Sequence, residues 1–194
     1  MISESRYWKA DLLRFADRLH RARTTARPFS ARAYVTVEKA VLMGAFVVRR
    51  LADSHKLSDS TSGMHLRATR WPSNGRGVTL ANNHRLDELF DFSRPERCQQ
   101  PLPFLCNQAI HSYVFATYSG RSSKSLAGVY LASDRQRNRA LFAVPLLEWE
   151  RAFRKVGDDY PTDAHYVFDD KLGDYKVTVR TRSKAGRGSR TRTS

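Results

Sequence analysis

The sequence predicts an α+β fold: an N-terminal antiparallel pair of helices packed on a mostly antiparallel sheet of four to six strands, with short helices between the strands. Apolar residues recur at helical spacing through the first 57 residues, and from residue 58 short alternating segments are separated by turn residues. We expect one domain over residues 1–179, helical in residues 1–57 and mixed but rich in strands in residues 58–179.

The first helix is expected to begin at Ser3 or Ser5 and to end near Arg27, because Pro28 cannot continue it. Four large apolar side chains recur at intervals of four, three and four residues, which places them on one face. They are Trp8, Leu12, Phe15 and Leu19. Arginines occupy the rest of the helix surface, so this helix packs on the fold with one side only.

The second helix is expected to start after Ser30, whose hydroxyl can cap it, and to run to about Ser54. Between Val35 and Leu51 it is apolar on nearly every side, a pattern typical of a helix at the centre of a fold. We therefore expect Phe46 to lie in the hydrophobic core.

Strands and short helices are expected over the rest of the chain. Residues 65–71 alternate as a strand does, and a turn at 72–77 leads to a return strand at 78–81. A short helix is expected at 86–92, followed by a loop bracketed by Pro95, Pro101 and Pro103, a short helix at 104–112 and a strand at 113–118. After these we expect a hairpin of 128–132 with 140–144, a helix from Pro145 to residue 156, and a last hairpin of 165–168 with 175–179.

The charge balance is the strongest functional signal. Lysine and arginine number 34 against 19 acidic residues, a formal net charge of +15. Such a surface favours polyphosphate partners, because each neutralised phosphate releases condensed counterions, and arginine can grip a phosphate at two points. An acidic protein or lipid headgroups would suit the same charge. The composition therefore predicts an anionic partner, with nucleic acid first.

A basic tail is expected at the end of the chain. Residues 180–194 hold six basic residues, no acidic residue and no large apolar one. A segment of this composition has nothing to bury, so we expect it to be disordered. Since six of the +15 charges lie in this tail, residues 1–179 keep a net charge of +9.

No metal or cofactor site and no membrane segment is predicted. The four candidate metal ligands lack the paired spacing of zinc sites; they are His84, Cys98, Cys106 and His111. Residues 75–77 lack the lysine and helix of a phosphate-binding loop. Residues 1–10 carry charges where a signal sequence is apolar, and the apolar run at 40–48 is shorter than the about 20 residues of a membrane span. We expect a cytoplasmic protein.

The segment 105–113 is the most motif-like stretch. Asn107 and His111 are four residues apart and share a face of the expected helix. An asparagine paired with a histidine can orient the imidazole as a general base near neutral pH. The same pair would also suit a structural role, in which His111 caps the helix end or holds the next strand. Asn107 and His111 are the candidate catalytic residues, and the structural interpretation stays open beside them.

Residues 106–111 resemble a degenerate form of the motif of HEPN ribonucleases, all-helical proteins that cleave RNA without metal at a dimer interface. In that family a polar residue, often asparagine, follows an arginine, and a histidine stands four to six residues beyond the arginine. Asn107 and His111 match the polar and histidine positions, and Cys106 occupies the arginine position. The resemblance implies a ribonuclease centred on Asn107 and His111. The pattern Leu-Cys-Asn-Gln-x-Ile-His-Ser-Tyr of residues 105–113 also resembles a segment of uncharacterised bacterial proteins, which implies no activity.

Basic loops and strand aromatics supply the expected nucleic-acid contacts. The predicted basic contacts are Arg121, Lys124, Arg135, Arg137, Arg139, Arg180, Arg182, Lys184, Arg187, Arg190 and Arg192. Aromatic residues on or near the strands can stack on single-stranded bases, and they equally suit the buried face of a sheet. They are Trp71, Tyr113, Phe115, Tyr118 and Tyr130.

These patterns predict a non-catalytic nucleic-acid-binding or accessory protein for RNA or single strands, since no helix-turn-helix or zinc-finger pattern indicates duplex reading. Two alternatives remain. One is a HEPN-like ribonuclease centred on Asn107 and His111. The other is a protein-interaction subunit whose basic surface docks on an acidic partner.

Overall fold

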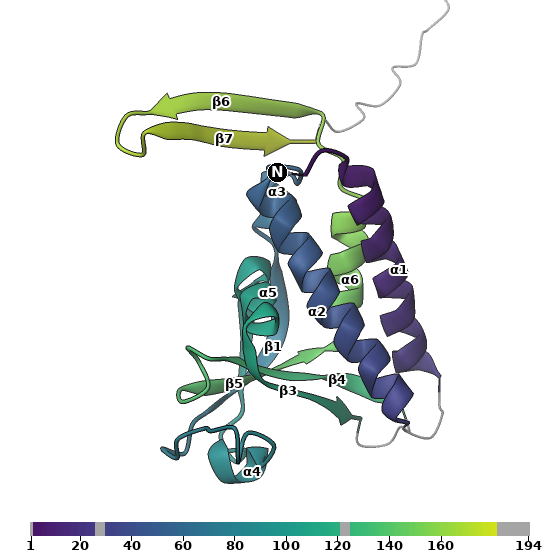
Figure 1. Cartoon of the computed structure of the whole chain (residues 1–194), viewed down its shortest axis with the longest axis vertical. Helices are drawn as coiled ribbons and strands as arrows, with labels where there is room; N and C mark the ends of the chain where they lie inside the picture. The colour runs from purple at the N-terminus through teal and green to yellow at the C-terminus, as the bar shows by residue number, and fades with distance from the viewer. Residues whose placement is uncertain (1, 26–29, 121–124, 182–194) are drawn as a thin grey trace, which may run out of the picture.

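The computed structural model describes residues 2–25, 30–120 and 125–181 and confirms the α+β class (Figure 1). Two long helices, α1 (Ser5–Thr24) and α2 (Ala31–Asp53), precede a five-stranded sheet and a separate two-stranded hairpin. The other helices are α3 (Asp59–Ser62), α4 (Leu86–Leu89), α5 (Leu102–Ile110) and α6 (Leu146–Gly157). The strands are β1 (His65–Pro72), β2 (Glu96–Pro101), β3 (Ser112–Ser119), β4 (Leu126–Ser133), β5 (Ala140–Pro145), β6 (Asp163–Asp169) and β7 (Asp174–Arg180).

The strands of the main sheet lie in the order β2–β1–β5–β4–β3, and every neighbouring pair is antiparallel. Figure 1 shows α1, α2, α5 and α6 on one side of this sheet and α4 on the other. Because successive strand residues point to opposite faces, each strand also supplies side chains to the side away from the four longer helices. We call that side the outer face.

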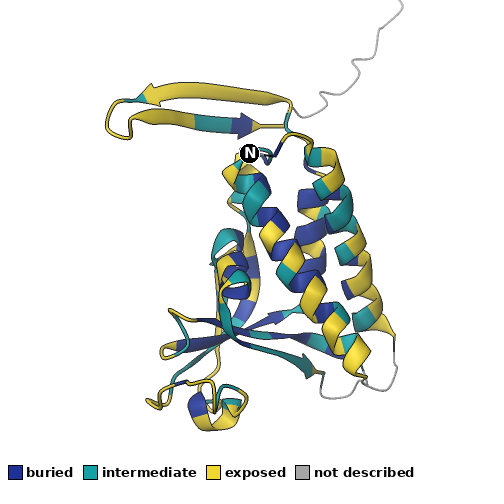
Figure 2. Cartoon of the chain, in the orientation of Figure 1, coloured by how far each residue is buried: buried dark blue, intermediate teal, exposed yellow. Residues whose placement is uncertain are grey.

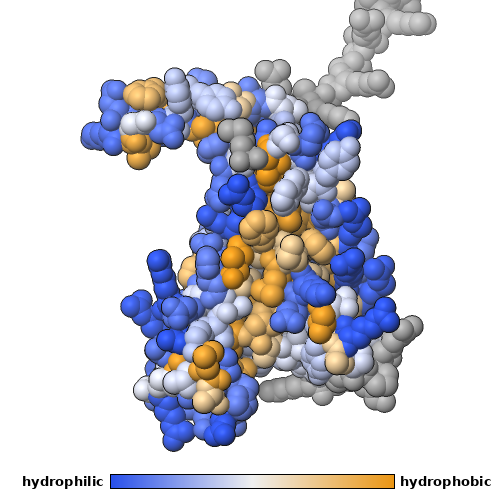
Figure 3. Space-filling view, in the orientation of Figure 1, coloured by the Kyte–Doolittle hydropathy of each residue, from blue (hydrophilic) through white to orange (hydrophobic). Residues whose placement is uncertain are grey.

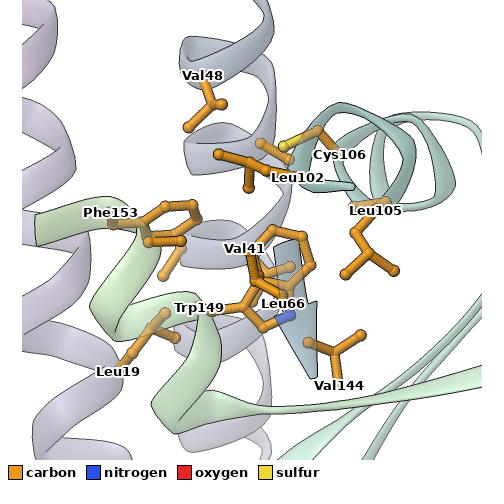
Figure 4. Close-up of a cluster of buried hydrophobic side chains, with 14 of the residues drawn as sticks. Leu19, Val41, Val48, Leu66, Leu102, Leu105, Cys106, Val144, Trp149 and Phe153 are labelled. Atoms are coloured by element: carbon orange, nitrogen blue, oxygen red, sulfur yellow. The ribbon is translucent and has the colours of Figure 1, made fainter. Parts of the chain in front are cut away.

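The main hydrophobic core lies between the helices and the sheet. Trp149 and Phe153 of α6 are fully buried there, among side chains of α1, α2, α5 and the strands (Figure 4). The Phe153 ring fills the space beside Gly44 of α2, where a Cβ would lie 2.3 Å from Phe153 Cζ. A glycine at this position therefore lets α2 and α6 approach closely.

Ion pairs join α1 to α6 at the edge of this core. The Glu150 carboxylate of α6 accepts hydrogen bonds from Arg23 Nη2 at 3.1 Å and from His20 Nδ1 at 3.0 Å. Arg154 of α6 pairs with Asp17 at 2.8 Å. Burial opposes ionisation of Glu150, but hydrogen bonds and the charge of Arg23 outweigh it, so the pKa of Glu150 lies below its usual value.

Lys9 is a buried cation that the sequence did not single out. It lies on the inner face of α1 and is 1% exposed. Its ammonium group donates to the backbone carbonyls of Lys56 and Asp159 and lies 4.4 Å from the centre of the Tyr160 ring. Burial lowers the pKa of Lys9, and the charge of Asp159 counteracts part of that effect. Lys9 thus fixes the end of α6 against α1.

The prediction that Phe46 lies in the core is wrong, because its side chain is 41% exposed. The ends of α2 agree with the prediction, and Ser30 caps it by accepting from the Ala33 N–H. However, α1 and α6 cover one side of α2 and α5 covers another. The third side, which carries Phe46, faces solvent.

The pairing predicted for β1 is also wrong. Residues 78–81 form no strand, and β1 pairs instead with β2 and with β5. β2 lies in the segment expected to be a proline-bracketed loop. Its only proline is the last residue, Pro101, and β2 is an edge strand, where a missing backbone N–H is tolerated. Residues 59–62, just before β1, form the short helix α3.

The last hairpin, β6 with β7, forms where the sequence predicts it and projects away from the helices (Figure 1). Arg180, which the sequence assigned to the tail, is the last residue of β7. Thr181 follows it and donates to Asp159 at 3.2 Å, and residues 182–194 of the predicted tail lie outside the described residues. Among the helices of the described ranges, none combines the length and the apolar character that crossing a membrane requires.

Candidate nucleic-acid interface

A cluster of four aromatic side chains lies on the outer face of the sheet. Trp71 of β1, Tyr118 of β3 and Tyr130 of β4 reach it by strand alternation, and Phe92 joins them from the segment after α4. The ring centres of Tyr118 and Tyr130 are 4.7 Å apart, those of Trp71 and Tyr130 5.8 Å, and those of Trp71 and Phe92 5.1 Å. The four rings thus form one cluster of tilted and edge-to-face contacts, which we call the aromatic platform.

Gly128 sets the position of the Tyr118 ring. The two residues are paired across β3 and β4, and a Cβ at Gly128 would lie 2.2–2.4 Å from the Tyr118 ring and hydroxyl. Tyr118 can therefore lie over the backbone of β4 and against Tyr130. Burial raises the pKa of Tyr118 to about 12, and it also raises the pKa of Tyr130. Both phenols are neutral at physiological pH, so the platform carries no negative charge of its own.

The platform is half-buried, not enclosed. Trp71, Tyr118 and Tyr130 keep part of their surface accessible, and Phe92 is 37% exposed. A small second core beside it, which contains Leu89, Phe90 and Leu141, holds the α4 segment on the outer face. This core packs against Trp71 and Tyr130, so it supports the platform from one side.

Two arginines border the platform. Arg94 follows Phe92 by two residues, and Arg97 of β2 lies opposite Thr69, which shares the outer face with Trp71. Both are exposed, and within the described residues neither side chain forms a hydrogen bond or ion pair. The charge of Arg94 does act on Asp91, where it helps the Ser93 hydrogen bond to lower the pKa of that carboxyl. They remain available for an anionic ligand.

The outer face continues beyond the platform as a groove at the edge of the sheet. The groove has a volume of about 510 Å³ and is lined by Arg67, Arg97, Gln99 and Glu148, among others. Arg67 is engaged by Glu148, which accepts from its guanidinium at 2.9 Å and from its backbone N–H at 3.0 Å. Arg97 is therefore the available cation of this groove.

The structure brings the predicted pair Asn107 and His111 to a second site. Both are exposed at the end of α5 and line a hollow of about 520 Å³ with Arg135 and Gln136 of the β4–β5 turn. The turn is fixed to the helix in two places: Gln108 Oε1 accepts from the Ser133 N–H at 2.9 Å, and the His111 carbonyl accepts from the Asp134 N–H at 3.1 Å. We call this site the α5 hollow.

The α5 hollow does not show the Asn–His pairing that the sequence suggested. Within the described part of the chain, no side-chain hydrogen bond joins Asn107 to His111. Cys106 points into the core, and its burial raises the pKa of the thiol far above the usual value, so it offers no thiolate. An arginine does reach the hollow, but it is Arg135, from a segment more than 20 residues away.

The other predicted basic residues divide into three groups. Arg137 is engaged, because its guanidinium lies 3.9 Å from the centre of the Tyr113 ring and 3.4 Å from Asp134. Arg139 and Arg180 are exposed and belong to neither site. The remaining predicted contacts lie outside the described residues; they are Arg121, Lys124, Arg182, Lys184, Arg187, Arg190 and Arg192.

Three of the five predicted aromatic contacts, Trp71, Tyr118 and Tyr130, belong to the platform. Phe115 faces the opposite side and packs on the main core, while Tyr113 lies under Arg137. Sequence reasoning missed Phe92, Arg94 and Arg97. If β2 had been recognised as a strand paired with β1, Arg97 would have been placed opposite Thr69, and therefore on the outer face.

Across residues 2–25, 30–120 and 125–181, no three His, Cys, Asp or Glu side chains are grouped closely enough to hold a metal ion. Comparison of the chain with protein-family models, with curated proteins and with solved structures found no match.

Proposed function

We propose that this protein binds single-stranded nucleic acid, RNA first, on the outer face of its sheet, as a non-catalytic or accessory protein of the cytoplasm. The observation that carries the proposal is the aromatic platform bordered by Arg94 and Arg97. Two unpaired cysteines, one of them buried, favour a reducing compartment.

The chemistry of the outer face suits an unpaired strand. Every base has a flat π-face, so a row of aromatic side chains can stack successive bases without reading their sequence. Guanidinium groups at the border can neutralise the phosphates between those bases. The formal net charge of +15 would draw a polyanion to the surface over a longer range. Single strands are favoured over a duplex because bases in a duplex are already stacked.

The electrostatic part of the proposal is tested by the salt dependence of binding to a fluorescent single-stranded RNA. Each phosphate contact on a single strand contributes about 0.7 to the slope of log affinity against log salt, so R94A with R97A should lower the slope by about 1.4. R14A with R21A removes the same charge from exposed positions on α1 and is the matched control. Equal slopes for the two double variants would contradict the proposed surface, and salt-independent or absent binding would end it.

The stacking part is tested with F92A. Phe92 is partly exposed, so its loss should leave the fold intact and remove one stacking surface, which lowers affinity by about 1–3 kcal/mol. Tyr7 of α1 is also exposed, and Y7A is the control, with unchanged affinity expected. An F92A protein that binds as tightly as the wild type would exclude base stacking at this position.

A second candidate, metal-independent RNA cleavage at the α5 hollow, is favoured by one observation: His111 is exposed beside Arg135, which has no side-chain partner within the described residues. Such cleavage uses a general base and a general acid. Among the residues lining the hollow, His111 is the one histidine, and Asp134 is paired with Arg137, so no second side chain there is placed to act as the acid. We therefore expect binding without cleavage.

Incubation of labelled RNA with the wild type and with H111A decides between the two functions. Because the His111 side chain is exposed, H111A should change the free energy of unfolding by less than about 0.5 kcal/mol. Any loss of cleavage in H111A would therefore reflect loss of the imidazole and not loss of the fold. Cleavage by the wild type, absent in folded H111A, would replace the binding function with the enzymatic one.

A further inference from the structure

The β6–β7 hairpin has one apolar and one polar face. Cross-strand partners in an antiparallel ladder point to the same side. The apolar face carries the pairs Ala164–Val179, Tyr166–Val177 and Phe168–Tyr175. The opposite face carries charged and polar side chains, with Val167 its one large apolar residue.

Among the described residues, the chain itself covers only the base of the apolar face. Val179 is buried, and its N–H donates to Asp59 of α3 at 3.1 Å. Farther out, Phe168 and Tyr175 are more than half exposed and pack edge to face, with ring centres 5.2 Å apart. Figure 2 shows most of the hairpin as exposed. An isolated two-stranded hairpin is marginally stable in water, so an apolar face that extends past the body indicates a partner.

The exposed side of α2 offers a second apolar surface. Val35, Met43 and Phe46 are exposed large apolar residues on this helix, and Leu42 lies between them, partly buried. Leu42, Met43 and Phe46 lie 7, 8 and 11 residues after Val35, so all four share one side of the helix. We call them the α2 stripe. Figure 3 shows hydrophobic side chains in the middle of this face, where α2 crosses it, and again on the hairpin.

The two surfaces carry opposite charges. Residues 163–176 hold four aspartates against two lysines, in a chain whose net charge is +15. Asp170, in the hairpin turn next to the apolar face, forms no ion pair within the described residues. Lys39 and Arg50 lie on the same side of α2 as the stripe, and they too lack a side-chain partner there. The β6–β7 hairpin is therefore acidic with an exposed apolar face, and the exposed side of α2 is apolar and basic, so the two surfaces are complementary in charge.

We propose that the protein self-associates by packing the apolar face of the β6–β7 hairpin of one copy on the α2 stripe of a second copy. Phe168 and Tyr175 meet the α2 stripe, and Asp170, in the turn two residues beyond Phe168, meets Lys39. Aspartates at the hairpin turn oppose a nucleic acid as occupant, so this contact is separate from the proposed RNA surface. Reciprocal exchange of two arms closes a dimer, because each copy contributes one hairpin and one stripe.

Sedimentation velocity of the nuclease-treated full chain, from about 1 to 100 µM, tests the proposal without bridging by nucleic acid. We expect a concentration-dependent dimer. F168S should raise the dissociation constant about tenfold or more, as loss of a buried aromatic anchor does. V167S is the matched control: it is the neighbouring residue, equally exposed, on the opposite face of the hairpin, and should leave the constant unchanged.

A second set of variants keeps the test independent of hairpin folding. F46S changes only an exposed position of α2 and should weaken the dimer as F168S does. D170K should also weaken it, and adding K39E should restore it. A monomeric wild type at every concentration, equal effects of F168S and V167S, or a dimer insensitive to F46S would each overturn the proposal.

Discussion

At the scale of single residues, two glycines determine where large rings can lie. Gly44 of α2 leaves room for Phe153 in the main core, and Gly128 of β4 leaves room for Tyr118 on the outer face. In both cases an added Cβ would lie within 2.5 Å of ring atoms. The first contact supports the packing of α2 on α6, and the second places one ring of the aromatic platform.

Replacing Gly44 by alanine should destabilise the protein by about 1–3 kcal/mol, because the new methyl group displaces a fully buried ring from a close-packed site. Urea titration measures the change. Gly77 is the control, since a Cβ there meets nothing within 4 Å, and G77A should alter the free energy of unfolding by less than about 0.5 kcal/mol. Equal stabilities of G44A and G77A would show that Phe153 does not occupy this space.

At the scale of elements, the sequence predicted correctly those helix ends and hairpins that depend on residues close to one another in the chain. The Ser30 cap, the β4–β5 hairpin and the β6–β7 hairpin depend on neighbouring residues, and each is present. The partner of β1 depends on a segment about 30 residues away, so β2 was missed. The exposed side of α2 could not be predicted, because a helix that is apolar on nearly every side does not reveal which face its neighbours leave open.

The contact between α1 and α6 is expected to depend on pH through Glu150. The folded protein holds the pKa of this carboxyl below its usual value, so its contribution to stability is complete above the pKa of the unfolded chain and is lost as pH falls. At pH 7, E150Q should cost about 1–3 kcal/mol, the value of a hydrogen bond to a charged group.

The difference between E150Q and the wild type should shrink as pH falls below about 4.3, where the unfolded carboxyl takes up its proton. Thermal unfolding between pH 3 and pH 7 measures this. E4Q removes an exposed carboxylate paired with Arg6 and should leave stability unchanged throughout. A constant difference between E150Q and the wild type over this range would show that the ion pairs with α1 are not what stabilises the contact.

At the scale of the whole molecule, the basic charge could be predicted from the sequence. Which residues come together at each candidate site could not. The spacing of Asn107 and His111 predicted that they share a face, and they do line one hollow. Arg135 joins them only because Gln108 and His111 fix the β4–β5 turn. The aromatic platform likewise depends on strand order, which places Trp71 of β1 within reach of Tyr130 of β4 across β5.

A chain that ends at Thr181 should still bind single-stranded RNA. Its loss of five basic residues lowers the formal net charge from +15 to +10, so affinity and salt slope should both fall. The outer face and the α5 hollow are unaffected, because every element through β7 is retained. Complete loss of binding, measured by fluorescence anisotropy, would assign the interaction to residues 182–194 alone.

The most direct test of the account is to map the contact itself. Ultraviolet cross-linking of a 4-thiouridine-containing single-stranded RNA to the wild type, followed by mass spectrometry, identifies the side chains that touch bases. We expect cross-links at Trp71, Phe92, Tyr118 or Tyr130, with further ones in residues 182–194. They should disappear in high salt, as a contact supported by phosphates requires. Cross-links confined to the tail, or to exposed aromatic residues elsewhere such as Tyr7 and Tyr166, would contradict binding on the outer face of the sheet.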